Sequence, residues 1–296
     1  MRSRWLLNLL LLLGVGILVL IARYEPGIRH TPPDATLTPI HTNEVTRIQL
    51  SRKDQPPLLL ELDDGTWRIA QSPPLPAEES QVASLARLAD QTAQRSYPVA
   101  DMDLKKLELD PPDSSVTLND LTLDFGALDA LDGLRYARVG PRVFMIPDLY
   151  QYLIDADASQ FVRRRILDPD THIHRIELPD LTLESVEGRW QATPDPGSAV
   201  DSDQLARFVE RWENAQALST RRDATNDNAG TVKLLLRGQD QPVTLVIRAR
   251  DPELVLARPE WGVQYVMGEA ADRFLKLAAP AATPAESAPP TPPPAP

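Results

Sequence analysis

The sequence contains no cysteine, and this absence removes several kinds of chemistry at once. Disulfide bonds, thiolate nucleophiles, thiolate-bound zinc and lipid attachment at cysteine are all excluded. The chain also lacks a Gly-rich phosphate-binding loop and the G-x-S-x-G elbow of serine hydrolases. Its 42 acidic residues are spread along the chain, and no pair is singled out as a general acid and base. We therefore predict no catalytic residue and no cofactor.

Positive charge is the scarcer sign in this chain. The 31 Lys and Arg residues against 42 Asp and Glu residues give a formal net charge of -11 and a pI of about 4.9. Binding to nucleic acid needs a basic surface that neutralises phosphates. The acidic balance therefore argues against nucleic acid as a main partner.

The chain has one long apolar run, and it lies in the first 24 residues, MRSRWLLNLLLLLGVGILVLIARY. The 17 residues from Leu6 to Ala22 carry no charge, and as a helix they reach about 25 Å, the short end of a membrane span. Two arginines before the run place the N-terminus in the cytoplasm. A cleaved signal peptide is the alternative, but Leu20 stands where a small residue is needed. We predict an uncleaved signal-anchor transmembrane helix over residues 1–24 in the inner membrane, and a periplasmic body.

Two proline-rich segments flank this body. Residues 25–42 are rich in Pro and Thr without an apolar period, and we interpret them as a stalk. Residues 279–296 are almost entirely Ala and Pro and cannot form a packed core. We predict that they form a disordered tail.

Between stalk and tail, the chain repeats itself in register. VTRIQL (45–50) matches IHRIEL (173–178), and LELDDGTWRI matches LESVEGRWQA, each with a Gly that favours a tight hairpin turn. A helical pattern follows in both copies, and Asp201 with Gln204 resembles a capping box in the second. Further strands and a short helix close each copy. We predict an α+β fold of two duplicated modules, each an antiparallel sheet with one main helix packed on it. Their ranges are residues 43–160 (module 1), a linker over 161–170, and residues 171–278 (module 2).

The order of these elements resembles a domain-of-unknown-function family of bacterial envelope proteins. The resemblance rests on GTWRI, LKKLELDPPDSSVTL, LRYARVGPRVFMI and FVRRRIL. Some members are encoded beside, or fused to, auxiliary components of gliding-motility-type ABC transporters, which implies a transporter of that type as a partner. The family commonly has Gly where Glu108 stands in LELDPP, so this turn is expected to differ.

Two sets of residues are candidates for binding. Arg163, Arg164 and Arg165 form the sharpest basic cluster, which is either a solvated link between the modules or a contact for anionic lipid or an acidic partner. Groove-facing aromatic residues would support a ligand site between the modules. The candidates are Trp190, Trp212 and Trp261.

A metal site is the weaker interpretation of the remaining polar motifs. His172 and His174 lie two apart in a strand-like run, which favours the polar face of a strand, and no third ligand has a recognisable spacing. The acidic loop 221–230 does not fit the EF-hand pattern. We therefore expect no bound metal.

These features favour a membrane-anchored periplasmic protein without enzymatic activity, acting as a scaffold or accessory subunit of an envelope complex. The alternative is a periplasmic binding module for glycan, peptide or lipid, with its site between the modules. An envelope hydrolase is the third hypothesis, and two close carboxylates in a deep cleft would support it.

Overall fold

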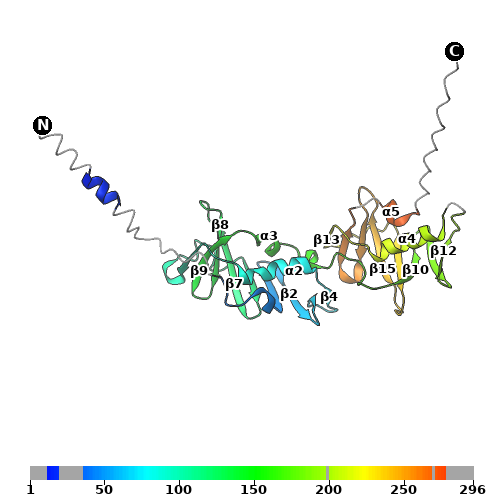
Figure 1. The fold of residues 1–296 in the computed structure, drawn as a ribbon, viewed down its shortest axis with the longest axis horizontal. Coiled ribbons are helices and arrows are strands. Elements are labelled where there is room, and N and C mark those ends of the chain that lie inside the picture. The colour runs from blue at the N-terminus through cyan, green and yellow to red at the C-terminus, as the bar shows by residue number, and fades with distance from the viewer. Residues whose placement is uncertain (1–11, 20–35, 198–199, 269–270, 278–296) are drawn as a thin grey trace, which may run out of the picture.

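A computed structural model describes residues 12–19, 36–197, 200–268 and 271–277 of the chain. Two antiparallel β-sheets dominate the structure and lie end to end (Figure 1). The helices are few and short, so the fold is mostly β rather than an even mixture of helix and strand. The predicted antiparallel sheets are therefore confirmed, whereas the helical share implied by an α+β class is too high.

Module 1 contains a nine-stranded sheet in the order β4-β3-β2-β1-β6-β7-β8-β9-β5. Its strands are β1 (Arg47–Arg52), β2 (Gln55–Asp63), β3 (Thr66–Ile69), β4 (Leu75–Pro76), β5 (Arg95–Pro98), β6 (Ser114–Leu118), β7 (Leu121–Leu128), β8 (Leu134–Val139) and β9 (Arg142–Pro147). Its α-helices are α2 (Glu79–Ala86) and α3 (Gln151–Ile154), and its 3-10 helices are η1 (Thr42–Glu44), η2 (Arg87–Asp90), η3 (Val99–Asp101) and η4 (Ala158–Phe161).

Module 2 repeats this topology strand for strand, except that no counterpart of β4 occurs in its described residues. Its eight-stranded sheet has the order β12-β11-β10-β14-β15-β16-β17-β13. The strands are β10 (Ile173–Glu177), β11 (Thr182–Val186), β12 (Arg189–Thr193), β13 (Ser219–Arg222), β14 (Thr231–Leu236), β15 (Val243–Ala249), β16 (Val255–Arg258) and β17 (Val263–Val266). The helices are α4 (Ser202–Glu213), η5 (Pro259–Trp261) and α5 (Asp272–Leu275). The identical order supports a duplication, as the sequence repeat predicts.

Local sequence signals explain the hairpins and the main helix. Asp64 and Gly65 both have positive φ, as do Glu187 and Gly188, which is the geometry of the two-residue turns that join twisted antiparallel strands. In α4 the predicted capping box forms: the backbone N–H of Gln204 donates to the Asp201 carboxylate at 2.7 Å. These short-range devices fix where strands and helix begin.

Two edge strands were not expected from the sequence. β5 and β13 follow the main helix of each module and pair with that module's last strand, β9 or β17. The main helix therefore connects one edge of its sheet, at β4 in module 1 or β12 in module 2, to the opposite edge. The last strand of each module, β9 or β17, then pairs with the edge strand that follows the main helix.

The predicted linker is a structural element that joins the two sheets. We call residues 161–167 the junction segment. On one side, the backbone N–H of Arg163 donates to Pro76 O (2.9 Å), and that of Glu78 donates to Phe161 O (2.7 Å). On the other side, residues 164 and 166 pair with residues 215–217, directly before β13. The buried apolar side chains of both modules form one connected core through this segment.

The predicted ends of the chain lie largely outside the described residues. Residues 12–19 are helical, and the rest of the predicted span over 1–24 lies outside, as does the tail over 279–296. Among the described residues, no helix is both long and apolar enough to cross a membrane. Residues 36–42 of the predicted stalk pack on module 1 instead, because Leu37 is buried and the Thr38 hydroxyl donates to Ala89 O at 2.8 Å.

Candidate functional site

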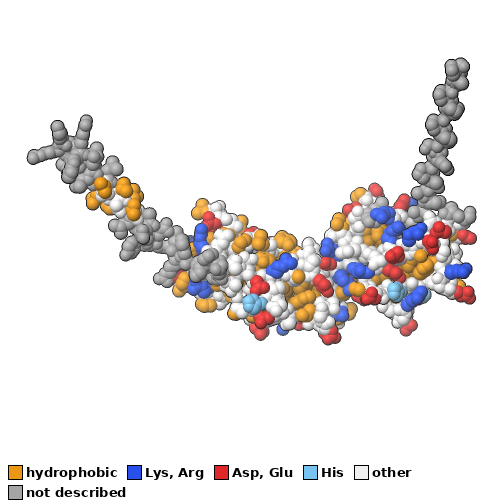
Figure 2. All heavy atoms as spheres, in the orientation of Figure 1, with side chains coloured by type: hydrophobic (Ala, Val, Ile, Leu, Met, Phe, Trp, Pro, Cys, Tyr) orange, Lys and Arg blue, Asp and Glu red, His pale blue; other side chains and the backbone are white. Residues whose placement is uncertain are grey.

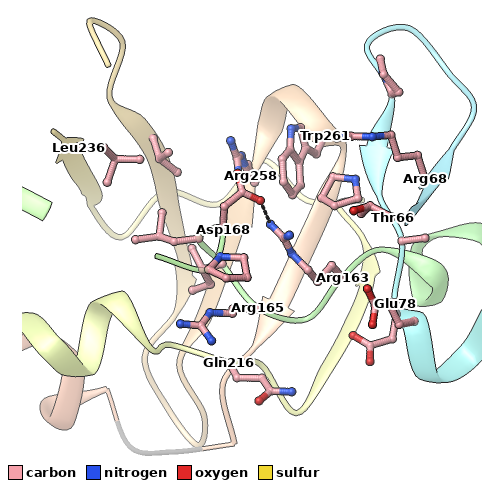
Figure 3. Close-up of a pocket in the computed structure, with 18 of the residues that line it drawn as sticks. Thr66, Arg68, Glu78, Arg163, Arg165, Asp168, Gln216, Leu236, Arg258 and Trp261 are labelled. Atoms are coloured by element: carbon pink, nitrogen blue, oxygen red, sulfur yellow. Dashed lines mark hydrogen bonds and ion pairs between the residues drawn. The ribbon is translucent and has the colours of Figure 1, made fainter. Parts of the chain in front are cut away.

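A groove of about 640 Å³ lies where the two modules meet, and we call it the junction groove. Module 1 contributes β3, β4 and the start of α2, the junction segment forms part of its wall, and module 2 contributes the end of β16 and η5 (Figure 3). Four arginines line the groove, namely Arg68, Arg163, Arg165 and Arg258. Three carboxylates, Glu78, Glu79 and Asp168, line it as well, so the arginines leave the groove slightly positive in a chain with a net charge of -11. Acidic and basic side chains are interspersed elsewhere on the surface shown in Figure 2.

The three predicted arginines of the linker have different roles. Arg163 lines the groove and donates to the Asp168 carboxylate at 2.6 Å (Figure 3). Arg165 lines it too and donates to Asn214 Oδ1 at 2.9 Å. The guanidinium of Arg164 instead holds Glu78 of module 1 and donates to Leu218 O of module 2 at 3.4 Å. The cluster is thus neither a freely solvated link nor one common surface.

Glu78 and Arg164 form the main charged contact across the junction. Both carboxylate oxygens of Glu78 accept from Arg164, one from the backbone N–H at 3.0 Å and one from the guanidinium at 3.1 Å. Burial on its own would raise the pKa of Glu78, but the hydrogen bonds from Arg164 and Ser80 outweigh it and lower that pKa below its usual value. Glu78 is therefore a structural carboxylate, ionised at neutral pH.

Only one of the three candidate tryptophans lines the groove. Trp261 does so, and the Arg258 guanidinium stacks on its ring at 3.5 Å from the centroid. Trp212 is completely buried in module 2, so its prediction as a ligand-stacking residue is wrong. Trp190 lies on β12, the edge strand farthest from the junction, and is half-buried against the core. Its prediction as a groove residue is therefore also wrong.

Sequence reasoning missed Arg68 and Arg258. Arg68 directly follows Trp67 in the GTWRI motif, and Arg258 precedes the turn that contains Trp261. Both arginines lie within three residues of a tryptophan in the sequence, which is the local signal that could have identified them. Their meeting in one groove depends on how the modules are joined. For metal binding, the described part of the chain contains no group of three or more His, Asp and Glu side chains that could hold an ion.

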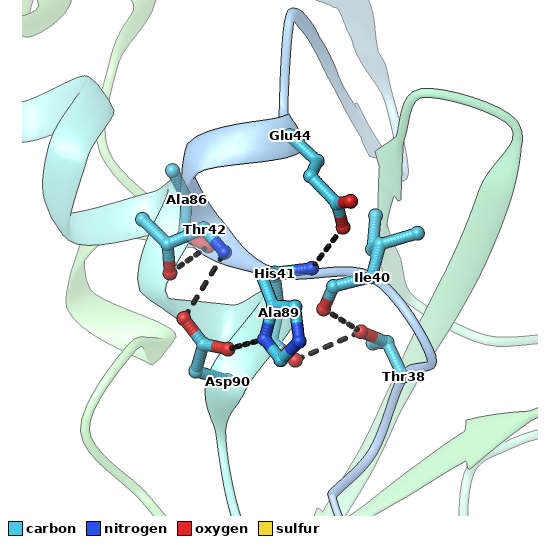
Figure 4. Close-up of polar contacts among 8 residues, drawn as sticks. All are labelled: Thr38, Ile40, His41, Thr42, Glu44, Ala86, Ala89 and Asp90. Carbon is cyan, nitrogen blue, oxygen red and sulfur yellow. Dashed lines mark hydrogen bonds and ion pairs between the residues drawn. The ribbon is translucent and has the colours of Figure 1, made fainter.

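A second polar cluster ties the segment before β1 to module 1 (Figure 4). His41 Nδ1 lies 2.9 Å from Asp90 Oδ1, and the backbone N–H of Thr42 donates to Asp90 Oδ2 at 3.0 Å. The hydrogen bond and the charge of Asp90 raise the pKa of His41. Hydrogen bonds from Thr42 and His41 lower the pKa of Asp90 to about 2. This cluster fastens the chain where it enters module 1.

We expect the contact between His41 and Asp90 to be strongest between about pH 4 and 6.5. Because the pKa of His41 is raised by folding, His41 stabilises the folded state at pH values below its pKa in the unfolded chain. This contribution is lost as the pH rises through its pKa in the folded protein. Asp90 has the opposite pH dependence: its lowered pKa stabilises the folded state above the unfolded pKa, and this contribution is lost as the pH falls toward 2. An NMR titration of His41 measures this, with Asp90→Asn as the comparison. A His41 midpoint that does not fall in Asp90→Asn would contradict the assignment.

The fold and groove define a tandem-module β protein with an arginine-lined cleft at the junction of its two sheets. In comparison with protein families, residues 67–234 match the family described as Domain of unknown function (DUF4340). Because this match covers more than half of the chain, the protein belongs to the DUF4340 family. The matched segment runs from β3 to β14 and so includes the junction segment and both of its partners. Searches of curated proteins and of solved structures found no match.

Proposed function

We propose that this protein is a non-enzymatic accessory subunit or scaffold of an envelope complex, anchored in the inner membrane with its body in the periplasm. The observation that carries the proposal is the junction segment, which pairs with both modules and connects their cores. A connection of this kind holds two modules as one body, which a scaffold needs in order to place its partners. It also leaves a groove at the junction, a common location for binding sites.

The membrane location is supported by the apolar run over residues 1–24. In the helix over residues 12–19, apolar side chains such as Leu12 and Leu18 are exposed (Figure 2). Exposed apolar surface of this kind is stabilised by a lipid or protein environment. The assignment of the complex as an ABC-type transporter rests on the family resemblance alone.

In-cell photocrosslinking tests the scaffold proposal. A photoreactive residue at Gln239, an exposed position on the rim of the groove, is expected to give adducts with an envelope protein. The matched control is Gln191, an exposed position on β12 at the far end of module 2. Mass spectrometry of the membrane extract identifies the adduct. Equal labelling from both positions, or none from Gln239, would overturn the proposal.

A second candidate is a binding module for a glycan, peptide or lipid, and the volume and aromatic wall of the groove favour it. About 640 Å³ is within the range of ligand pockets, and Trp261 gives an apolar face beside several hydrogen-bonding groups. A low-mass adduct at Gln239 in place of a protein would identify this function.

A further inference from the structure

Two of the four arginines in the junction groove are not held by a hydrogen-bonded carboxylate. Asp168 binds Arg163 at 2.6 Å, and Glu260 binds Arg258 at 2.7 Å. The closest ion-pair contact of Arg68 is to Asp63 at 3.7 Å, beyond hydrogen-bonding distance. Within the described part of the chain, no carboxylate pairs with Arg165, which donates only to Asn214 and to the Glu213 backbone oxygen.

The groove arginines also have hydrogen-bonding capacity that the fold does not use. The Nε atoms of Arg68, Arg163 and Arg165 are buried without a hydrogen-bond partner among the described residues. These Nε atoms are closed to solvent, and Arg52, Arg164 and Arg175 outside the groove lining share the feature, so a ligand would have to bind through the terminal Nη atoms. The Arg68 Nη atoms, and one of the two in Arg165, donate to no described residue, and such a planar guanidinium is suited to bind a carboxylate.

The carboxylates that line the groove repel a negatively charged ligand only weakly. Both oxygens of Glu78 are occupied by Arg164, whose charge compensates it. Glu79 and Asp168 are exposed, where water screens them. The net charge of -11 acts at longer range, and salt at about 0.1 M screens charges more than about 10 Å apart. The nearby arginines therefore determine that the groove favours a negatively charged ligand.

The groove extends beyond the junction and so favours an extended ligand. A second hollow of about 700 Å³ shares Arg68 and Pro74 with it and continues along β2 and β3 past Arg47. Glu61 and Asp63 line this second hollow together with Arg47 and Arg68, so its charges balance, whereas the junction groove has more arginines than carboxylates and also presents Trp261 and Pro169. An extended peptide can reach both hollows, whereas a single small ligand would use one of them.

We propose that the junction groove binds an extended acidic peptide segment of a partner protein, whose carboxylates pair with Arg68 and Arg165. This inference rests on the proposed scaffold function and names the chemistry of the partner at the same site. Arg258 stacks on one face of the Trp261 ring, and the part of this side chain that stays exposed offers an apolar contact in the same groove.

Fluorescence anisotropy with the full-length protein in detergent micelles tests the inference. The probe is a fluorescein-labelled octapeptide of alternating Glu and Ser, and the same peptide with Lys for Glu is its control. We expect the acidic peptide to bind, and Arg68→Gln with Arg165→Gln together to weaken binding at least tenfold. Arg189→Gln, an exposed arginine on β12, is the matched control and is expected to leave binding unchanged.

Arg165→Gln also removes hydrogen bonds to residues 213 and 214, so Arg68→Gln alone is the second variant. The Arg68 side chain makes no hydrogen bond to the described residues, only a long and largely exposed ion pair to Asp63, and its replacement should weaken binding severalfold without lowering the melting temperature. Equal binding of the Lys peptide, no binding of the Glu peptide, or binding of polyphosphate alone would overturn the inference. If a protein adduct forms at Gln239 but the acidic peptide does not bind, the scaffold function stands and this partner chemistry fails. If the acidic peptide binds but no protein adduct forms at Gln239, the groove has the proposed ligand chemistry and the scaffold function fails.

Discussion

Replacing Trp212 with alanine is expected to lower the free energy of unfolding by about 4 kcal/mol. The side chain is 0% exposed, its indole N–H donates to Phe274 O at 3.1 Å, and its ring meets that of Phe274 edge-on at 5.3 Å between centroids. The substitution removes a large buried side chain, leaves a cavity and deprives a buried carbonyl of its donor. It also disconnects α4 from α5, so the end of module 2 should loosen.

Urea unfolding of the full-length protein, followed by circular dichroism, measures this effect. Trp190→Ala is the matched control, since Trp190 is only half-buried at the outer edge strand, and its cost should be clearly smaller. Trp212→Phe keeps an aromatic ring in the core, and its loss of unfolding free energy should lie between those of Trp212→Ala and Trp190→Ala. A loss of less than about 1 kcal/mol for Trp212→Ala would contradict the assignment of this side chain as a main contributor to the core of module 2.

Replacing Glu78 with glutamine is expected to lower the free energy of unfolding by about 2 to 3 kcal/mol at pH 7. The Glu78 side chain is 12% exposed and that of Arg164 is 33% exposed, so water recovers part of the cost of an unpaired guanidinium. Because this pair joins module 1 to the junction segment, its loss should also weaken the coupling between modules. We expect one cooperative unfolding transition to separate into two.

The pH dependence distinguishes the charge of Glu78 from its shape. A lowered carboxyl pKa stabilises the folded state above the unfolded pKa and is lost as the pH falls through the folded value. The difference between the natural protein and Glu78→Gln should therefore be largest above about pH 5 and shrink below pH 4. Glu79→Gln, at the exposed neighbouring position, serves as the control and should change stability by less than about 0.5 kcal/mol. A difference that stays constant from pH 7 to pH 3 would exclude the ion pair as its cause.

The features predicted correctly from sequence depend on contacts between near neighbours in the chain. The hairpin turns at Gly65 and Gly188 and the capping box of α4 require only a few adjacent residues. The duplication was visible because both copies keep the same order of such signals. At Glu108, where the resemblance leads us to expect Gly, φ is +58°, a conformation that glycine adopts more readily.

The features that were missed depend on contacts between distant residues. β5 and β13 are four-residue edge strands whose partners lie more than 40 residues later, and RSYP and STRR have no regular apolar alternation. The groove likewise forms only when residues 190 positions apart, Arg68 and Arg258, are brought to one junction. By contrast, the burial of Trp212 was already implied by its position on the apolar face of α4 with Leu205 and Phe208.

The way in which the modules are joined gives the molecule a direction. Module 1 meets the junction through the β4 side of its sheet and module 2 through its β13 side, so the edges left at the two outer ends, β5 and β12, are also unlike. Joining like edges would have made a pseudo-twofold pair that is the same from either end. Head-to-tail joining instead makes a polar rod, in which both copies present a given surface in the same sense along the chain. A partner with regularly repeated features would therefore meet the two copies in succession, and could recognise from which end it approaches.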